Sequence, residues 1–331
     1  NYAKTNPQNG RKYFTLEDGT PFSFPKRIPK TLKFKIRDDD PDDQYARLYA
    51  THAVDAIRSL SLPRYGLGNY VATSPDNLPT QAEAEVIKNL SRAGKRLIGF
   101  SRTNLFKRLE SSGDVFLLSI QRHILRNYIF LHALENNKPL PIGTQEPGLL
   151  DTLIVDEDDD PSTTGEDFSG DDGEERRPDA DLSALKTLAD YSKRAAAVYT
   201  QYGTQFKTRF KWLRSDLFRS DLAKDLTRDA AELFKVLQKA GKWDPDKDAK
   251  LDALHKLLTK THPKEKVIVF TQFADTVRYL EEQLRRRGVK NLAGVTGEDE
   301  DPTGYVWRFS PDSNNKRAII HTDSILRIIV A

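Results

Sequence analysis

Two polar residues, Thr271 and Gln272, stand where the chain changes from a predicted strand to a predicted helix. The run before them, Val267-Ile268-Val269-Phe270, is β-branched and aromatic, which is typical of a parallel strand covered on both faces. In open parallel sheets ligands bind at the carboxyl ends of the strands, and the free N–H groups at a helix start suit phosphate. We therefore expect Thr271 and Gln272 to contact a nucleic-acid backbone.

The stretch from Lys250 to Gly297 resembles the start of the second motor lobe of the Swi/Snf branch of superfamily-two helicases. In that family a lysine-leucine helix precedes a strand ending in Phe-Ser/Thr-x-Phe, the motif IV, which Phe270 to Phe273 match. The next strand ends in Val295-Thr296-Gly297 and matches motif IVa. The positions that the resemblance implies to contact the phosphates of the tracked strand are Thr271, Gln272, Thr296 and Gly297.

Three further segments are similar to other parts of that family. Ile325 to Ala331 resembles the strand before motif V. Arg102 to Gly113 and His123 to Asn137 resemble the helical region between the lobes of large bacterial Swi/Snf-like proteins, including the RapA-like group and helicases of phage-defence islands. The resemblance implies part of a bacterial, cytoplasmic, nucleoid-associated ATP-dependent DNA translocase or helicase. Its partner would be double-stranded DNA, with the helices available to a protein partner.

The motifs that hold and hydrolyse ATP are missing from this sequence. A motor ATPase needs a phosphate-binding GxxxxGK(S/T) loop, whereas Gly94-Lys95 is followed by Arg96 and Gly241-Lys242 by Trp243. The family's Gln-Arg-x-Gly-Arg motif, which carries its arginine finger, is also absent. We therefore expect ATP and Mg to bind between two lobes of a larger protein. This chain alone is expected to have no catalytic residues and no ATP hydrolysis.

Other patterns that imitate catalytic or metal sites are weak. Leu153 to Asp158 has the form of a Walker B strand, but it opens an acidic run and no phosphate loop precedes it. The chain has no Cys, which excludes disulfides, cysteine nucleophiles and thiolate metal sites. Its six His residues are scattered without metal-ligand spacing. We expect no metal site.

Charge is segregated along the chain. Asp151 to Asp181 contains fourteen acids and two Arg, a net charge of −12, so the other 300 residues carry +15 although the whole chain carries +3. A basic body with a separate acidic segment fits an anionic partner, and nucleic acid is the leading candidate. A solvated basic surface explains the same numbers.

A group of basic residues interleaved with Phe206, Phe210 and Trp212 leaves the same two interpretations open, a solvated face or a grip on DNA. The basic residues of this group are Arg122, Arg126, Lys207, Arg209, Lys211 and Arg214.

We expect an α/β fold with a large all-α portion, made of a helical insertion region and an incomplete RecA-like parallel-sheet lobe. Asp18-Gly19 between two short aromatic strands predicts a hairpin within Lys12 to Phe24. Thr31 to Ile36 alternates as a half-buried strand does. The predicted domains are 1–37, hairpin and connector strands; 38–138, helical region; 139–181, acidic flexible linker; 182–247, charged helices; and 248–331, partial second RecA-like lobe.

Apolar residues at helical spacing predict most of the remaining elements. A break at Ser111 to Gly113 separates two long helices, and Ser112 or Asp114 can cap the second one. The second helix, from Val115 to Leu134, is rich in large apolar residues and should be well buried. The predicted helices cover 42–61, 79–109, 112–134, 181–240 in two or three pieces, 251–260 and 274–287, and the later strands cover 292–295 and 325–330.

The sequence as a whole indicates a soluble intracellular protein. No apolar run approaches the about 20 residues that a membrane helix needs, and the start of the sequence lacks the features of a signal peptide. The absence of Met from 331 residues favours an internal fragment of a longer protein. A rival interpretation is a helical interaction or scaffold protein whose α/β end has no motor role.

Overall fold

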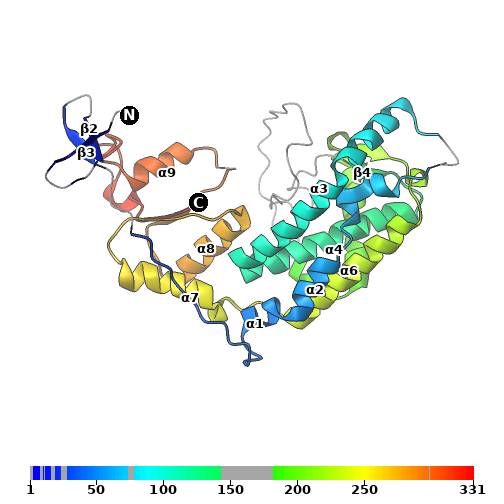
Figure 1. Ribbon diagram of the computed structural model, residues 1–331, viewed down its shortest axis with the longest axis horizontal. Coiled ribbons are helices and arrows are strands. Elements are labelled where there is room, and N and C mark those ends of the chain that lie inside the picture. Colours follow the sequence, from blue (N-terminus) through cyan, green and yellow to red (C-terminus); the bar gives the residue numbers. More distant parts are fainter. Residues whose placement is uncertain are drawn as a thin grey trace. The chain divides into compact units, whose positions relative to one another are not determined.

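A computed structural model describes residues 3–7, 10, 12–15, 19–23, 28–73, 78–142, 182–297 and 299–331. The chain is a mixed α/β protein with a large helical part and a small parallel sheet, and it divides into two compact units, Asn1–Phe34 and Lys35–Ala331 (Figure 1). The finer domain boundaries given above stay predictions. Most of the acidic segment, residues 143–181, lies outside the described residues.

The first unit is a three-stranded antiparallel sheet in the order β1 (Lys4–Thr5), β2 (Lys12–Thr15), β3 (Pro21–Ser23). The hairpin of β2 and β3 is confirmed, and Gly19 supplies a positive φ of 84° in its connection. The strand predicted at Thr31 to Ile36 is wrong, because that segment forms no strand and pairs with no described strand. Alternation alone does not make a strand when no neighbour supplies the ladder.

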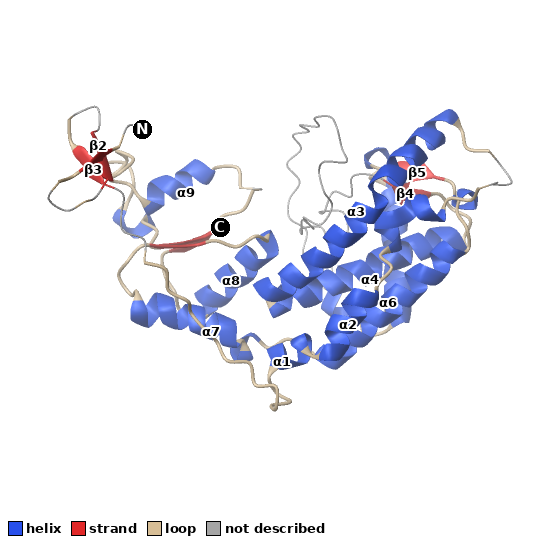
Figure 2. Cartoon of the chain, viewed as in Figure 1, coloured by secondary structure: helices blue, strands red, loops and turns tan. Residues whose placement is uncertain are grey.

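The helical part of the second unit is built around one buried helix, α4 (Gly113–Glu135). It contacts α3, α5 and α6, and sixteen of its 23 residues are buried, which confirms the expectation for this segment (Figure 2). The other helices are α1 (Gln44–Tyr49), α2 (Thr51–Ser59), η1 (Pro63–Tyr70), α3 (Gln81–Ser111), η4 (Leu182–Ala184), α5 (Leu188–Thr204), η5 (Lys207–Arg209), η6 (Ser215–Leu217), α6 (Asp221–Ala240) and η7 (Pro245–Lys247).

The predicted break between α3 and α4 is confirmed at Ser112, whose backbone is extended. Its side chain makes no capping bond, so the cap predicted for Ser112 is wrong. The corner is set by packing, because the ring of Trp243 lies where a side chain at residue 113 would stand. A Cβ added to Gly113 would be 2.3 Å from two ring carbons of Trp243. Only glycine fits there.

A short antiparallel pair, β4 (Leu140–Ile142) with β5 (Lys211–Leu213), was not predicted. All three residues of β4 are buried, which corrects the assignment of the whole range 139–181 to a flexible linker. Three residues are too few to show a strand period, so no pattern in the sequence predicts this pair.

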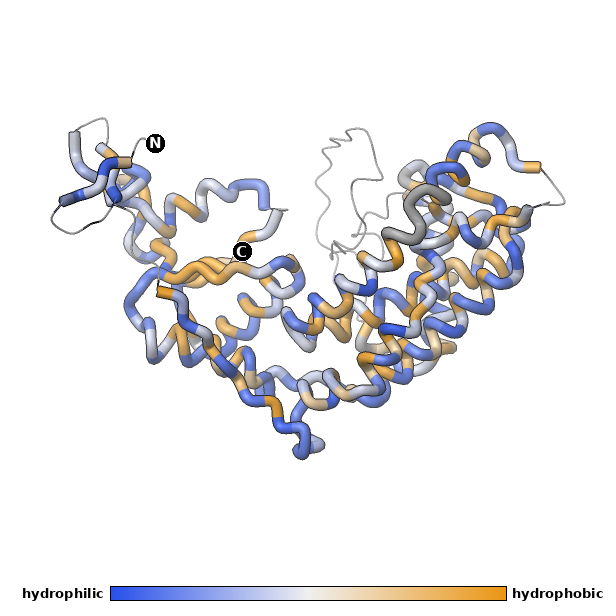
Figure 3. The backbone as a smooth tube through the Cα atoms, in the orientation of Figure 1, coloured by the Kyte–Doolittle hydropathy of each residue, from blue (hydrophilic) through white to orange (hydrophobic). Residues whose placement is uncertain are grey.

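The α/β part contains three parallel strands in the order β6 (Val267–Val269), β8 (Ile328–Val330), β7 (Leu292–Gly294). Figure 3 shows these strands as a hydrophobic band. Helix α8 (Ala274–Arg286) covers one face, since Val277 and Glu281 lie against Gly294. On the other face Ala293 and Ile329 form a cluster with residues of α9 (Pro302–Phe309). The remaining elements are α7 (Ala249–Lys256), the π-helix η8 (Leu257–Thr261) and η9 (Thr322–Ser324).

The expectation that the strand at 267–270 is covered on both faces is wrong. Ile268 is 46% exposed and Phe270 is 81% exposed. By register Ile268 lies beside Ile329 on the α9 face. The partly buried residues packed on that face, Tyr305 and Phe309 among them, are grouped with β7 and β8 rather than with β6.

No helix within the described ranges combines the length and the apolar character that crossing a membrane requires.

The Gly113 corner can be tested by adding one methyl group. Gly113→Ala is expected to destabilise the chain by about 1–3 kcal/mol, because the new Cβ overlaps the Trp243 ring. Thermal and urea unfolding followed by circular dichroism would measure the loss. The matched control is Gly99→Ala on the exposed side of α3, where a Cβ meets no atom within 4 Å. The control should leave the melting temperature unchanged or slightly higher, and equal destabilisation by both variants would contradict the packing argument.

Candidate nucleic-acid interface

The four residues predicted to contact phosphate lie at one edge of the parallel sheet. Thr271 and Gln272 follow β6, whereas Thr296 and Gly297 follow β7, and β8 runs between these two strands. Backbone bonds tie the three strand ends together. The N–H of Thr271 donates to the carbonyl of Ala331 at 2.6 Å, and the N–H of Val295 donates to Val330 at 2.8 Å. Thr271 and Gln272 lie two strand spacings, or about 10 Å, from Thr296 and Gly297.

Thr271 is half-buried and its hydroxyl is joined to the helical part. Its Oγ1 lies 3.2 Å from Oγ of Ser111, the last residue of α3, and Ser111 Oγ lies 2.8 Å from Oγ1 of Thr276 in α8. A hydroxyl has one donor and two acceptor positions, so this row leaves Thr271 only part of its bonding capacity for a ligand. Its main contact is structural.

Gln272 is the most available of the four side chains. It is exposed, and its amide makes no hydrogen bond to any residue that the structure describes. The next residue, Phe273, is buried, and the guanidinium of Arg108 lies 4.6 Å from its ring centre. Phe273 therefore anchors the turn while Gln272 presents its amide to solvent.

Thr296 has donors suited to an anion, but a carboxylate of the chain already accepts from them. Its backbone N–H and its hydroxyl both donate to Oδ2 of Asp299, at 2.6 and 3.1 Å. Tyr305 donates to the other oxygen of Asp299 at 3.2 Å. Gly297 is exposed, and a Cβ there would meet no atom within 4 Å. A phosphate at this point would have to displace Asp299.

A buried carboxylate, Asp275, joins this edge to the long helices. Its Oδ2 lies 2.7 Å from Nη1 of Arg122 and 3.2 Å from Nη1 of Arg108. Nη2 of Arg122 also donates to Oδ1 at 3.3 Å, and Arg278 lies 3.6 Å from that oxygen. The bonds link α8 to α3 and α4. Sequence reasoning missed Asp275 and Arg108, because their partners lie more than 150 residues apart.

Two of the arginines in the predicted basic group are not on the surface. Arg122 and Arg126 are almost completely buried, so they form neither a solvated face nor a grip on DNA.

The basic and aromatic residues near β5 are also used largely within the protein. Phe210 is buried and stacks on Tyr202 at a centroid distance of 4.4 Å. Trp212 Nε1 donates to the carbonyl of Lys207 at 2.8 Å, and Arg214 pairs with Glu83 at 3.0 Å. The rings pack on one another, and the exposed members of this group among the side chains that the structure describes are Lys207 and Lys211.

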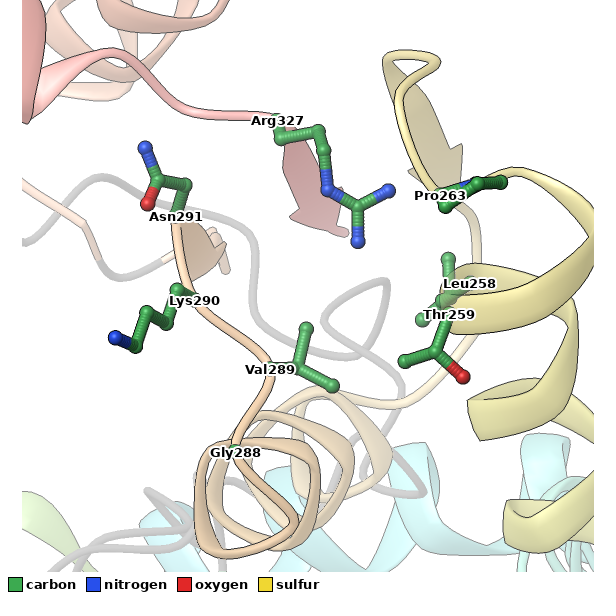
Figure 4. A pocket seen from close by; sticks show the side chains of 8 residues that line it. All are labelled: Leu258, Thr259, Pro263, Gly288, Val289, Lys290, Asn291 and Arg327. Atoms are coloured by element: carbon green, nitrogen blue, oxygen red, sulfur yellow. The ribbon is translucent and has the colours of Figure 1, made fainter.

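The opposite, amino-terminal edge of the sheet holds an open pocket of about 380 Å³ (Figure 4). None of its lining residues is acidic, and Lys290 and Arg327 contribute positive charge. Arg327 Nη1 donates to the carbonyl of His262 at 2.9 Å, so part of this charge holds the loop before β6. The lining residues are Leu258, Thr259, Pro263, Gly288, Val289, Lys290, Asn291 and Arg327.

Among the described residues no three His, Asp or Glu side chains gather in one place, and the sequence has no phosphate-binding loop. ATP with Mg therefore stays a prediction for a larger protein, and no step depends on it here.

A second buried carboxylate, Asp248, joins α8 to α1 and α7. It accepts from the hydroxyl of Tyr279 at 2.8 Å and from that of Tyr45 at 3.3 Å. It also caps α7 through the N–H groups of Lys250 and Leu251. Asp114, at the start of α4, shares this environment. Burial, together with the nearby carboxylates of Asp248, Glu282 and Asp275, raises the pKa of Asp114 to about 6.

Removing the Asp275 charge should be costly. Asp275→Asn removes the carboxylate that pairs with two buried guanidinium groups, and we expect a loss of about 3 kcal/mol in the free energy of unfolding. The control is Asp252→Asn, which removes a largely exposed carboxylate paired with Arg287 and should cost well under 1 kcal/mol. Urea unfolding measures both, and similar costs would show that Asp275 does not join the helices to α8.

Asp114 should make stability depend on pH in the opposite sense to an ordinary ion pair. The folded chain binds its proton with a pKa of about 6, whereas an unfolded Asp has a pKa of about 3.9. Stability is therefore lost as pH rises between about 4 and 6. Asp114→Asn should raise the free energy of unfolding by about 1–2 kcal/mol at pH 7.5 and change it little at pH 4. The same effect at both pH values would rule out the raised pKa.

Comparison of this chain with protein-family models, with curated proteins and with solved structures found no match.

Proposed function

We propose that this chain is part of an ATP-dependent DNA translocase of Swi/Snf type, in which the parallel sheet belongs to the second RecA-like lobe. One observation supports this most. The segments with the motif IV and motif IVa patterns end at the same carboxyl edge of a parallel sheet, on either side of β8. This is the edge at which open α/β sheets bind ligands.

Each of the four residues has a different role in this proposal. The exposed amide of Gln272 donates to a phosphate oxygen, and Gly297 lets the backbone approach the strand closely. Thr271 is held by Ser111, and Thr296 takes part only when Asp299 swings away. Such contacts carry no base information, so binding would be independent of sequence and weakened by salt.

In this proposal helices α3 and α4 hold the carboxyl edge of the sheet in position. Because Asp275 and Ser111 join α8 and Thr271 to α3 and α4, a displacement of these helices is passed to the edge that holds the DNA. ATP and Mg would bind between this lobe and another one, on residues that this chain does not supply. The site of action would be the bacterial nucleoid.

A protein-interaction role is the second candidate, and specific observations favour it. Asp299 occupies anion-binding donors, Glu300 and Asp301 follow it, and Phe270 is 81% exposed at the same end of β6. Acids repel phosphate, whereas a large exposed ring suits a protein partner.

A charge placed at residue 272 tests the proposed function. Fluorescence anisotropy of the chain with a labelled 20-base-pair duplex would give the dissociation constant at low and moderate salt. Gln272→Glu is expected to weaken binding about fivefold, since it places a like charge beside phosphate at a cost of ~1 kcal/mol. The matched control is Gln81→Glu at an exposed position of α3, which should leave the affinity unchanged.

A second variant at this edge separates the two candidates. Asp299→Asn removes the competing carboxylate, so duplex affinity should rise if DNA binds at this edge. The scaffold interpretation gains instead if neither Gln272→Glu nor Asp299→Asn changes duplex binding.

A further inference from the structure

The first unit of the chain is strongly basic. Residues 1–34 contain seven Lys or Arg and two acids, a net charge of +5, although they make up about a tenth of a chain whose total charge is +3. Such a local excess of positive charge attracts a polyanion over about 10 Å, the distance at which moderate salt screens charges.

This unit has no core in the part that the structure describes. Its strands have two, four and three residues, and none of its described residues is buried. A sheet this small cannot be stabilised by burying its own apolar side chains. Its described side chains are therefore surface groups.

Aromatic rings and lysines share both faces of this sheet. Phe14 and Phe22 are direct partners across β2 and β3, with ring centres 5.1 Å apart and planes inclined by 44°. Phe22 is 41% exposed. Lys12 lies two residues before Phe14 and so stands on the same face, whereas Lys4 is the register partner of Tyr13 on the other face.

We propose that this sheet binds single-stranded nucleic acid. A base stacks on the exposed ring of Phe22, beside which the ring of Phe14 lies, while Lys12 and the exposed Lys30 and Lys33 attract the phosphates. Aromatic stacking beside cations is the chemistry of sequence-tolerant single-strand binding. A duplex fits less well, because its bases are stacked on each other and offer no free face. This inference uses no residue of the carboxyl edge.

The test compares single-stranded and duplex ligands on the full chain. Anisotropy with a labelled 15-nucleotide oligo-dT at 50 mM salt should show tighter binding than a duplex of equal length. Phe22→Ala should weaken oligo-dT binding about tenfold, within the range for loss of one stacked base. The matched control is Phe100→Ala, which removes an equally exposed ring from α3 and should change nothing.

Two further variants keep the outcome decisive. Phe22→Tyr retains the ring and should retain the affinity, so a loss in both Phe22 variants would indicate damage to the sheet and overturn the stacking role. Lys12→Glu should weaken binding and reduce its salt dependence, whereas Lys88→Glu on exposed α3 should not. Equal oligo-dT affinity for Phe22→Ala and Phe100→Ala also overturns the proposal.

Binding to lipid vesicles and binding of a duplex at the carboxyl edge would respond differently to these variants. If vesicles of phosphatidylserine bind the chain and Phe22→Ala abolishes that binding while oligo-dT is unaffected, the sheet is a membrane contact and the proposal fails. Gln272→Glu should change duplex binding and leave oligo-dT binding intact, so failure at one site is distinguishable from failure at the other.

Discussion

Asp275 holds a carboxylate where water is excluded, between the start of α8 and the guanidinium groups of Arg108 and Arg122. Charges in such a place are tolerated only when each finds its partner in good geometry. The start of α8, the end of α3 and the first half of α4 are therefore fixed together. Thr271 belongs to that arrangement through Ser111, so its position depends on the helices as well as on the sheet.

Most of the hydrogen-bonding groups described at the carboxyl edge already have partners within the chain. Thr271 bonds to Ser111, and both donors of Thr296 are taken by Asp299. A phosphate arriving there would gain bonds only by replacing existing ones, so the net free energy per contact is small. The open contacts are Gln272 and Gly297. An interface of this kind suits a strand that must be held and released repeatedly better than one that must be bound tightly.

Local patterns predicted the elements around this edge well, because the strand, turn and helix from Val267 to Arg286 are each encoded by neighbouring residues. Features that depend on distant residues were not predictable. The partners of Asp275 come from α3 and α4, and the exposure of Ile268 depends on α9, which was not foreseen. The strand prediction for Thr31 to Ile36 was wrong for the same reason, since a strand requires a neighbour that its own sequence does not specify.

Net charge is a poor guide to what this chain binds. The total of +3 combines an acidic segment of −12, a first unit of +5 and a charge of +10 on the remaining residues. At ionic strengths near 0.1 M a ligand responds to charges within about 10 Å, so each surface acts by its own composition. The carboxyl edge has acids and an exposed amide, whereas the small sheet pairs lysines with an exposed ring. In our two proposals the first would hold a backbone and the second a base, so duplex and single strand would be contacted by different residues.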